Sequence, residues 1–375
     1  MALLASIATL ACSTAALALA AVCTNNGDCS LNGLCSTTGV CVCDKPWKGA
    51  SCESLAYAKT PVSGKDLYPF NNTGAAIVPS TSLNTWNGPI VGPVDGEYHF
   101  YNPIYHANSL LSGNGIMHGV SKAIAGPYNW FTHPHIKGGT NPAAVTYVDP
   151  ADGKTKYTLW QGAVQQSESP NGPWVEVMKR YPGGNPAPVF HKGAWYFTSQ
   201  STTEVMMTPT LSMNSTWALW GKVDHANVTS GTQPEDPFMW IDKRDNWHIV
   251  NHAYNTGQFT NCGSSTLSTH FFSPDGKTWR SLPGTGTTAQ PYGHTVEYED
   301  GTSHTYTTLE RPNLHFDATG QLTHINLAAD MITGDAGCKG RAAPVPCPAR
   351  NKNGCACTNC KYADHAGSII VTLDV

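Results

Sequence analysis

Lys192-Gly-Ala-Trp-Tyr-Phe197 is the stretch that decides the fold, because four other segments of the chain resemble it. Each segment places a strand with aromatic residues after a turn marked by Gly or Asp. The other four begin at Asp95, Asp152, Arg244 and Asp300, so the segments recur at intervals of roughly 40–57 residues. A second strand usually follows and ends on a turn and a Trp, as in Ser169-Pro-Asn-Gly-Pro-Trp174. Strand repeats of this period predict an all-β, five-bladed β-propeller whose inner strands line a central funnel.

The composition agrees with an all-β fold and excludes some partners. The chain has 375 residues, with 36 Gly, 26 Pro, 11 Trp and 15 Tyr, which is typical of turn-rich β proteins. Only 13% of residues are charged and the net charge is -4, so no basic stripe is available for nucleic acid. We therefore expect no nucleic-acid partner.

The first 20 residues form a small, apolar run that ends in Ala18-Leu-Ala20. This is the pattern of a signal peptide with its cleavage site, although a basic n-region is missing. A signal anchor is the alternative, and no other stretch is apolar enough to span a bilayer. We expect a secreted, extracellular protein without a membrane span in its mature form. Three glycosylation sequons agree with secretion, at Asn71, Asn214 and Asn227.

Twelve of the thirteen cysteines lie after this apolar run, and an even number in a secreted chain predicts disulfides. Parity further predicts that Cys262 pairs with one of the five cysteines between 338 and 360. The cysteines are Cys23, Cys29, Cys35, Cys41, Cys43, Cys52, Cys262, Cys338, Cys347, Cys355, Cys357 and Cys360. A metal site at Cys355-x-Cys357-x2-Cys360 is the alternative, and secretion disfavours it.

The spacing of the first six cysteines, with one residue between the fourth and the fifth, resembles an epidermal-growth-factor-like module. Spacing alone leaves fifteen connectivities open. The resemblance implies the pairs Cys23–Cys35, Cys29–Cys41 and Cys43–Cys52. A zinc site is disfavoured because no Cys-x2-Cys pair is repeated. We expect a disulfide module over residues 21–53, with a spacer role or a protein partner.

The rest of the chain divides into a linker and the propeller. Residues 54–80 read as the linker and residues 81–375 as the propeller. A Cys-, Gly- and Pro-rich insertion interrupts the propeller at 334–362. After it, residues 368–375 predict a strand that closes the ring by joining a neighbouring blade, since a free apolar edge would promote aggregation.

The positions just upstream of the five aromatic segments are expected to line the funnel. Four of them place Asn, Asp or Gly before Pro, a combination that also suits an ordinary turn into a strand. We predict that five side chains there point at one axis. They are Asn87, Asn141, Asn185, Asp236 and His294.

The repeats, the Asx-Pro inner strands and the Ser-x-x-Gly-Pro-Trp turns resemble the five-bladed glycoside hydrolases of family 43 and its relatives. The motifs Asn185 to Pro188, Glu235 to Trp240, Trp247 to His252 and Glu310 to Pro312 resemble most a secreted branch of that group. The resemblance covers residues 81–333. It implies three catalytic carboxylates on the first three blades, where this chain instead has Asn87, Asn141 and Asn185. An amide cannot take a proton at neutral pH, so the family mechanism does not transfer directly.

Other carboxylates remain for catalysis. Asp236, Glu235 and Glu310 are the candidate catalytic residues, because two facing carboxylates suffice for glycoside hydrolysis. The rival interpretation of Glu310 is a structural ion pair with Arg311. His248 and His252 lie four residues apart on one strand face, where they would bind sugar or a metal or be buried in the core. The candidate substrate-binding residues are Trp86, Asn87, Asn141, Asn185, Trp240, His248, His252, His294 and Arg311.

Two functions follow from this interpretation. The first is a glycoside hydrolase-like protein acting on extracellular or cell-wall glycans. The second is a lectin-like or scaffold protein that has lost catalysis and binds glycan through the funnel amides. Carbohydrate is the expected partner in both. We assign no cofactor and no metal, and a calcium ion in the funnel has no direct sequence support.

Overall fold

The computed structural model describes residues 23–64, 83–106, 109–132, 136, 141–255, 267–306, 309–330 and 366–375. Within these ranges the elements are β-strands, together with two 3-10 turns, η1 (Asn26–Cys29) and η2 (Val62–Gly64). The predicted signal peptide, the sequon at Asn71, and the cysteines at 262 and 338–360 lie outside the described residues. None of the helices in the described part is long and apolar enough to cross a membrane.

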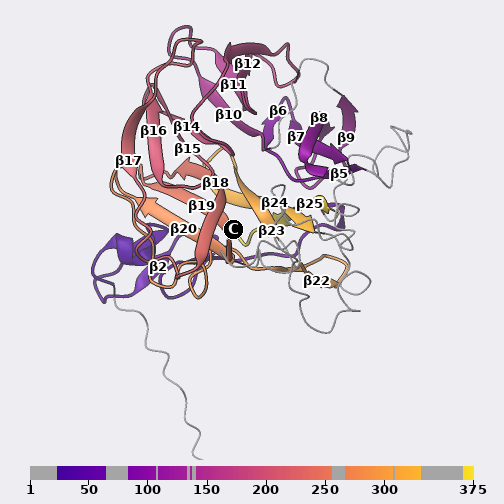
Figure 1. Ribbon diagram of the computed structural model, residues 1–375. Helices are drawn as coiled ribbons and strands as arrows, with labels where there is room; N and C mark the ends of the chain where they lie inside the picture. Colours follow the sequence, from indigo (N-terminus) through magenta and orange to yellow (C-terminus); the bar gives the residue numbers. More distant parts are fainter. Residues whose placement is uncertain are drawn as a thin grey trace, which may run out of the picture.

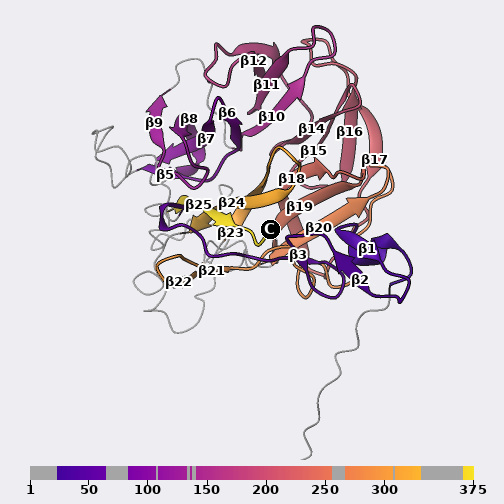
Figure 2. The same ribbon diagram turned by 180° about the vertical axis from the view of Figure 1, so that it is seen from behind.

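The strands form a five-bladed β-propeller, and the blades follow one another around a single axis (Figures 1 and 2). Blade one contains β5 (Leu83–Thr85), β6 (Ile90–Val94), β7 (Glu97–His106), β8 (Ser109–Ser121) and β9 (Asn129–Thr132). Blade two contains β10 (Ala143–Val148), β11 (Thr155–Trp160), β12 (Val164–Ser167) and β13 (Val175–Met178). Blade three contains β14 (Ala187–His191), β15 (Ala194–Thr198), β16 (Glu204–Thr208) and β17 (Ala218–Lys222). Blade four contains β18 (Thr232–Ile241), β19 (Trp247–Asn255) and β20 (Leu267–Ser273), and blade five contains β23 (Leu309–Phe316), β24 (Leu322–Asp330) and β25 (Ala366–Thr372).

The aromatic segments explain how neighbouring blades pack against each other. Successive side chains of a strand point to opposite faces of its sheet, so two adjacent aromatic residues serve two interfaces. Trp195 packs against Trp160 of blade two, with ring centroids 5.8 Å apart. Tyr196, the next residue, packs against Trp247 of blade four at 4.9 Å. The repeated sequence therefore encodes the stacking of the blades.

The fifth repeat was assigned to the wrong segment. Asp300 lies in the turn of a separate hairpin, β21 (Thr295–Glu297) and β22 (Ser303–Thr305), and not in blade five. Blade five turns instead at Asp317-Ala-Thr-Gly320, between β23 and β24. The strand after this turn lacks adjacent aromatic residues, so it does not match the pattern of the other blades.

The predicted closing strand exists with different bounds and a different partner. β25 runs antiparallel to β24 within blade five itself, rather than joining the sheet of a neighbouring blade. It also lies against blade one, where Thr85 Oγ1 is 3.4 Å from Ser368 Oγ. The segment after the N-terminal module joins it as well. The Ala58 amide donates to the Thr372 carbonyl at 3.0 Å, and the Asp374 amide donates to the Ala56 carbonyl at 2.9 Å.

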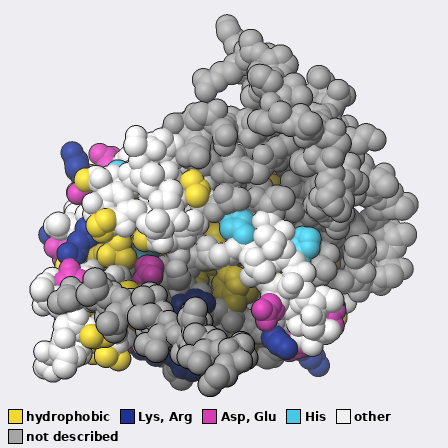
Figure 3. All heavy atoms as spheres, turned by 90° about the horizontal axis from the view of Figure 1, so that it is seen from below, with side chains coloured by type: hydrophobic (Ala, Val, Ile, Leu, Met, Phe, Trp, Pro, Cys, Tyr) yellow, Lys and Arg dark blue, Asp and Glu magenta, His cyan; other side chains and the backbone are white. Residues whose placement is uncertain are grey.

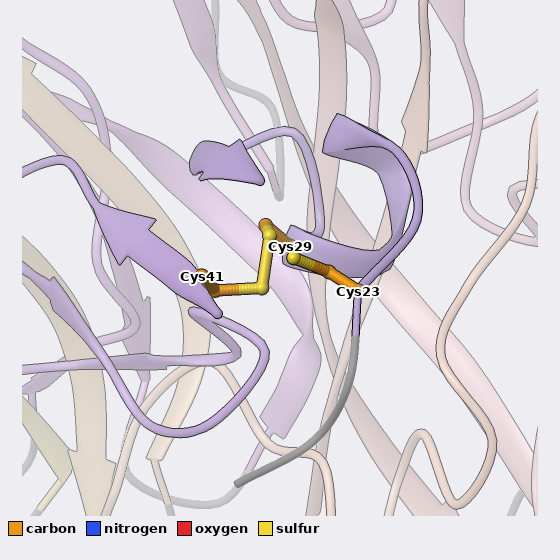
Figure 4. A group of neighbouring side chains, drawn as sticks. All are labelled: Cys23, Cys29 and Cys41. Atoms are coloured by element: carbon orange, nitrogen blue, oxygen red, sulfur yellow. A yellow bond between two sulfur atoms is a disulfide. The ribbon is translucent and has the colours of Figure 1, made fainter. Parts of the chain in front are cut away.

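The N-terminal disulfide module, residues 23–55, has the three pairs that were expected. They are Cys23–Cys35, Cys29–Cys41 and Cys43–Cys52; Figure 4 shows the bond that joins Cys29 to Cys41, with Cys23 beside it. The module contains β1 (Gly33–Cys35), β2 (Cys41–Cys43), β3 (Trp47–Lys48) and β4 (Ser54–Leu55).

This module is packed on the propeller beside β20 (Figures 1 and 2). The Trp47 ring lies parallel to the rings of Trp240 and His270, with centroids 6.4 and 5.3 Å away. The Arg244 guanidinium pairs with Asp44 and also donates to the Leu31 carbonyl at 2.8 Å. Trp47 and Leu55 belong to the same hydrophobic core as β18 and β23–β25. The module is thus part of the folded unit.

Charged side chains are scattered over the described part of the surface. Figure 3, seen from below, shows lysine and arginine side chains interspersed with acidic ones among many uncharged groups. On this face the described residues form no basic stripe, in agreement with the low charge of the sequence.

Candidate active site at the propeller axis

Four residues just ahead of a Pro or a Gly-Pro, where the chain meets the axis, have a left-handed backbone. They are Asn87 (φ 54°), Asn185 (φ 47°), Asp236 (φ 51°) and Arg311 (φ 51°). Asp236 and Arg311 lie at bulges within β18 and β23, whereas Asn87 and Asn185 precede β6 and β14. Asn and Asp tolerate this conformation better than other non-glycine residues, which explains the repeated Asx-Pro sequence. For Arg311 the same conformation is a strained one, of the kind that is concentrated at functional sites.

Asp236 is the centre of a hydrogen-bonded group on the axis. Its Oδ1 accepts from the side-chain amides of Asn141, at 2.9 Å, and of Asn185. Its Oδ2 accepts from Arg311 Nε at 3.2 Å. Asp236 is buried, and these bonds replace the water that an ionised carboxylate needs. We call Asn141, Asn185, Asp236 and Arg311 the axial ring.

Asn87 joins blade one to blade five beside this ring. Its amide donates to the Arg311 carbonyl at 2.8 Å, and its Oδ1 accepts from Asn326 Nδ2 at 2.6 Å. Gly88, which follows Asn87, cannot be replaced, because a Cβ there would lie 1.9 Å from the Tyr101 carbonyl oxygen. Four of the five predicted axis residues, all except His294, therefore meet near the axis. His294 lies before β21, where its Nδ1 is 3.1 Å from the Tyr306 carbonyl.

A second group of titratable residues lies between blades four and five. Glu235 and Glu310 directly precede the two bulge residues on β18 and β23, and both face the ring of His252 on β19. The His252 Nε2 atom is 3.7 Å from Glu235 Oε2 and 3.9 Å from Glu310 Oε2. The other ring nitrogen, Nδ1, is 3.5 Å from Asp236 Oδ2. This carboxylate–histidine cluster thus adjoins the axial ring.

Neighbouring side chains hold the two glutamates in place. Gln200, on the loop between β15 and β16, donates to Glu235 Oε1. Trp86 Nε1 donates to Glu310 Oε2 at 3.2 Å, and the Arg311 guanidinium lies over the Trp86 ring at 5.9 Å. Arg311 also forms an ion pair with Asp236, with Nε 3.2 Å from Oδ2.

The environment of Glu235 favours its protonated form. Burial raises the pKa of this carboxyl, and the nearby charges of Asp236 and Glu310 raise it further. His252 and the hydrogen bond from Gln200 act in the opposite direction and are outweighed. A carboxyl group with a raised pKa is suited to act as a general acid near neutral pH.

The same residues offer ligands to a metal ion. One atom each from Asp236, His252 and Glu310 lie within 4.8 Å of one another. Two carboxylates and a histidine suit several divalent ions. However, Arg311 already donates to Asp236 Oδ2, so a cation at this position would compete with the guanidinium. We therefore assign no metal here.

A cavity of about 360 Å³ extends along the axis from the axial ring. Its walls are the inner strands of blades two to five, with Phe190, Phe238 and Phe316 among the apolar side chains. At its polar end, Asn141 Oδ1 is buried and has no hydrogen-bond partner among the residues that the structure describes. A ligand hydroxyl would satisfy this oxygen.

The remaining predicted site residues lie outside the axial ring and outside the carboxylate–histidine cluster. Trp240 lines the axial cavity but is buried, and its ring is parallel to that of His248 at 4.7 Å. His248 shares a strand face with His252, yet it lies at the opposite end of β19, beside the N-terminal module. The sequons at Asn214 and Asn227 are exposed.

Sequence patterns did not reveal three residues that complete the site. Gln200 donates to Glu235, and Asn326 donates to Asn87. The third residue, His315, is bonded to Asn326. None of the three belongs to a motif that the sequence analysis singled out. Only the register of neighbouring strands brings them to the axis, and no single segment carries that information.

Comparison with known structures identifies the class of fold. The α-L-arabinofuranosidase of Podospora anserina, solved in complex with cellotriose, superposes with a TM-score of 0.53 at 9% identity and covers 86% of this chain and 98% of its own. The catalytic domain of the family 62 α-L-arabinofuranosidase of Coprinopsis cinerea gives 0.52 at 11% identity with the same coverage. No protein-family model and no curated protein sequence matches the chain. The chain is therefore a five-bladed β-propeller that resembles glycoside hydrolases at low sequence identity.

Proposed function

We propose that this protein is a secreted glycoside hydrolase that acts on extracellular or cell-wall glycans. The observation that supports this most strongly is the pair Glu235 and Glu310, which face one nitrogen of His252 from neighbouring inner strands. Since both oxygens lie within 4 Å of that nitrogen, the two carboxyl groups are close enough for either the roughly 5–5.5 Å of retaining glycosidases or the roughly 6.5–9.5 Å of inverting ones. The N-terminal module is, in this proposal, an epidermal-growth-factor-like unit attached to the enzyme.

The two glutamates take different roles. Glu235, whose pKa is raised by burial, donates its proton to the glycosidic oxygen as the bond to the anomeric carbon breaks. Glu310, held by the Trp86 indole, accepts the proton of the attacking water. Asp236 was the first sequence candidate for catalysis. Because both of its oxygens are bonded to protein groups, we assign it instead to positioning His252 and the axial ring.

The second candidate function is glycan binding without catalysis. It is favoured by the amides of Asn87, Asn141 and Asn185, at positions where the related hydrolases are expected to carry carboxylates. It is also favoured by the axial cavity, whose polar end offers the unbonded Asn141 Oδ1 to a hydroxyl. The glutamate pair is not needed for this function.

A release assay separates the two. The wild-type chain, Glu235→Gln and Glu310→Gln are incubated with plant and algal polysaccharides, and reducing ends are measured. Glu204→Gln, on the exposed part of β16, is the control. The hydrolase proposal expects release by the wild type and the control, and at least about a 100-fold lower rate in either site variant. Binding without release by the wild type would establish the second function instead.

A further inference from the structure

A cleft of about 510 Å³ lies between the N-terminal disulfide module and blades four and five. One wall is formed by Leu31, Asn32, Asp44, Lys45 and Trp47 of the module. The other is formed by Trp240 to Arg244, His248, Phe316 and Gly320 to Leu322. Its volume is within the range of small-molecule sites, and none of the candidate catalytic residues lines it.

Contacts between the two walls hold the cleft open in a fixed shape. Arg244 pairs with Asp44 and donates to the Leu31 carbonyl. Gln321 Nε2 donates to the Lys45 carbonyl at 2.5 Å. The parallel rings of Trp47 and Trp240 join the walls below these polar contacts. A preformed cleft loses less conformational entropy when a ligand binds.

The lining combines apolar rings with polar groups that are available to a ligand. Phe316 is partly exposed and supplies an apolar surface. The ammonium groups of Lys45 and Lys243, one on each wall, form no hydrogen bond and no close ion pair within the described part of the chain. The Arg244 charge is shared between Asp44 and Asp242, at a nitrogen–oxygen distance of 3.6 Å to the latter. The lining therefore carries three cations and two carboxylates, and Asp317, outside the lining, also interacts with Lys243.

We propose that this cleft is a binding site for an acidic oligosaccharide, in which a sugar ring packs on Phe316 and a carboxylate bridges Lys45 and Lys243. A lysine on each wall fits a carboxylate that lies across the cleft, because each ammonium can donate to a different oxygen. The free amide oxygen of Gln321 accepts from a sugar hydroxyl. The cleft and the axial cavity share Trp240 and Phe316 as lining residues, so the two sites are neighbours. This site does not depend on catalysis at the axis.

Isothermal titration of the full chain with a galacturonate tetramer tests the proposal, with the methyl-esterified tetramer as the matched uncharged ligand. We expect the acid to bind at least about tenfold more tightly than the ester, and this preference to weaken with salt. The double variant Lys45→Gln/Lys243→Gln should lose the preference. Lys48→Gln, on the same module but outside the cleft, should keep it.

Three results would overturn the proposal. The first is equal affinity for acid and ester, and the second is an unchanged preference in the double variant. The third is an equal loss of preference in Lys48→Gln, which would indicate attraction to the module as a whole. Circular dichroism and thermal melting verify that each variant is folded, and exposed lysines tolerate this change.

Discussion

The Asn141 amide donates a 2.9 Å hydrogen bond to Asp236 Oδ1, although the two residues belong to blades two and four, which are not neighbours. The bond therefore crosses the axis rather than joining adjacent sheets. With Asn185 of blade three and Arg311 of blade five, it ties four inner strands to one carboxylate. A single side chain thus connects most of the ring of blades.

Asp236→Asn should destabilise the protein by about 3 kcal/mol, because it removes the ion pair with the Arg311 guanidinium and turns an amide toward two other amides. Urea unfolding followed by tryptophan fluorescence measures the loss. Asp224→Asn is the control, since Asp224 is exposed and accepts from the nearby Ala226 backbone amide. A variant as stable as the wild type would show that the axial ring contributes little to folding.

Glu235 should make the stability of the protein depend on pH. Its folded-state pKa is above that of the unfolded chain, so its contribution is complete below about pH 4 and is lost as the pH rises through the raised pKa. Glu235→Gln cannot ionise. We therefore expect the variant to gain stability relative to the wild type as the pH increases from 4 to 8. A constant difference across this range, measured by urea unfolding, would contradict the assignment of Glu235 as a buried acid.

Asp242 should make the stability of the folded protein depend on pH in the acid range. Burial alone would raise its pKa, but His248, with Nε2 3.6 Å from Oδ2, and the hydrogen bonds from Asn246 outweigh burial and lower the pKa to about 2. Its contribution is present above pH 4 and is lost as the pH falls toward 2. Since burial lowers the pKa of His248, that ring is neutral at pH 7 and contributes a polar contact rather than an ion pair. Asp242→Asn should then cost about 1–2 kcal/mol at pH 7, and the difference should vanish near pH 2.

Trp47→Ala should destabilise the whole protein rather than the module alone. The variant removes a buried ring that contacts Trp240 and His270, and we expect a loss of about 3–5 kcal/mol. Scanning calorimetry should show one transition that moves to lower temperature. Val42→Ala, at an exposed position of the same module, should leave it unchanged. Two separate transitions would mean that the module folds independently.

The remaining cysteines give a prediction from parity. Three disulfides account for six of the twelve cysteines that follow the apolar N-terminal run. We expect the other six to be oxidised, with Cys262 bridged to one of the cysteines at 338–360. Thiol titration of the denatured, unreduced protein should give close to zero, whereas stoichiometric zinc with reactive thiols would favour a metal site.

The sequence was most informative where one segment encodes one structural role. Adjacent aromatic residues predicted the blades because the two residues of a pair pack on opposite neighbouring blades, as Trp195 and Tyr196 do. Asx before Pro predicted the axis, since Asn185 and Asp236 accept the left-handed backbone found there. Blade five was misplaced because its Arg311-Pro312 bulge and its β24 strand lack both signals.

The roles of the site residues depend on contacts that no segment reveals. Glu235, Asp236 and Glu310 were all expected in the funnel, but their partners come from other blades. Asp236 is bonded by Asn141 and Asn185, whereas Glu235 and Glu310 face His252. Which carboxylate is committed to structure and which remains available is decided by strand register and by the bulges.

The pairing of β25 with β24 affects how the chain folds while it is being synthesised. The ribosome releases residues 56–58 long before residues 366–374, yet these two segments hydrogen-bond to each other in the folded protein. Four blades can form while the chain emerges, but blade five stays incomplete and its β24 edge unpaired until the last strand arrives. The nascent chain therefore exposes the apolar edge of β24 from the time that this strand is made until β25 follows it, and truncation before Ala366 should yield a product that depends on chaperones and aggregates without them.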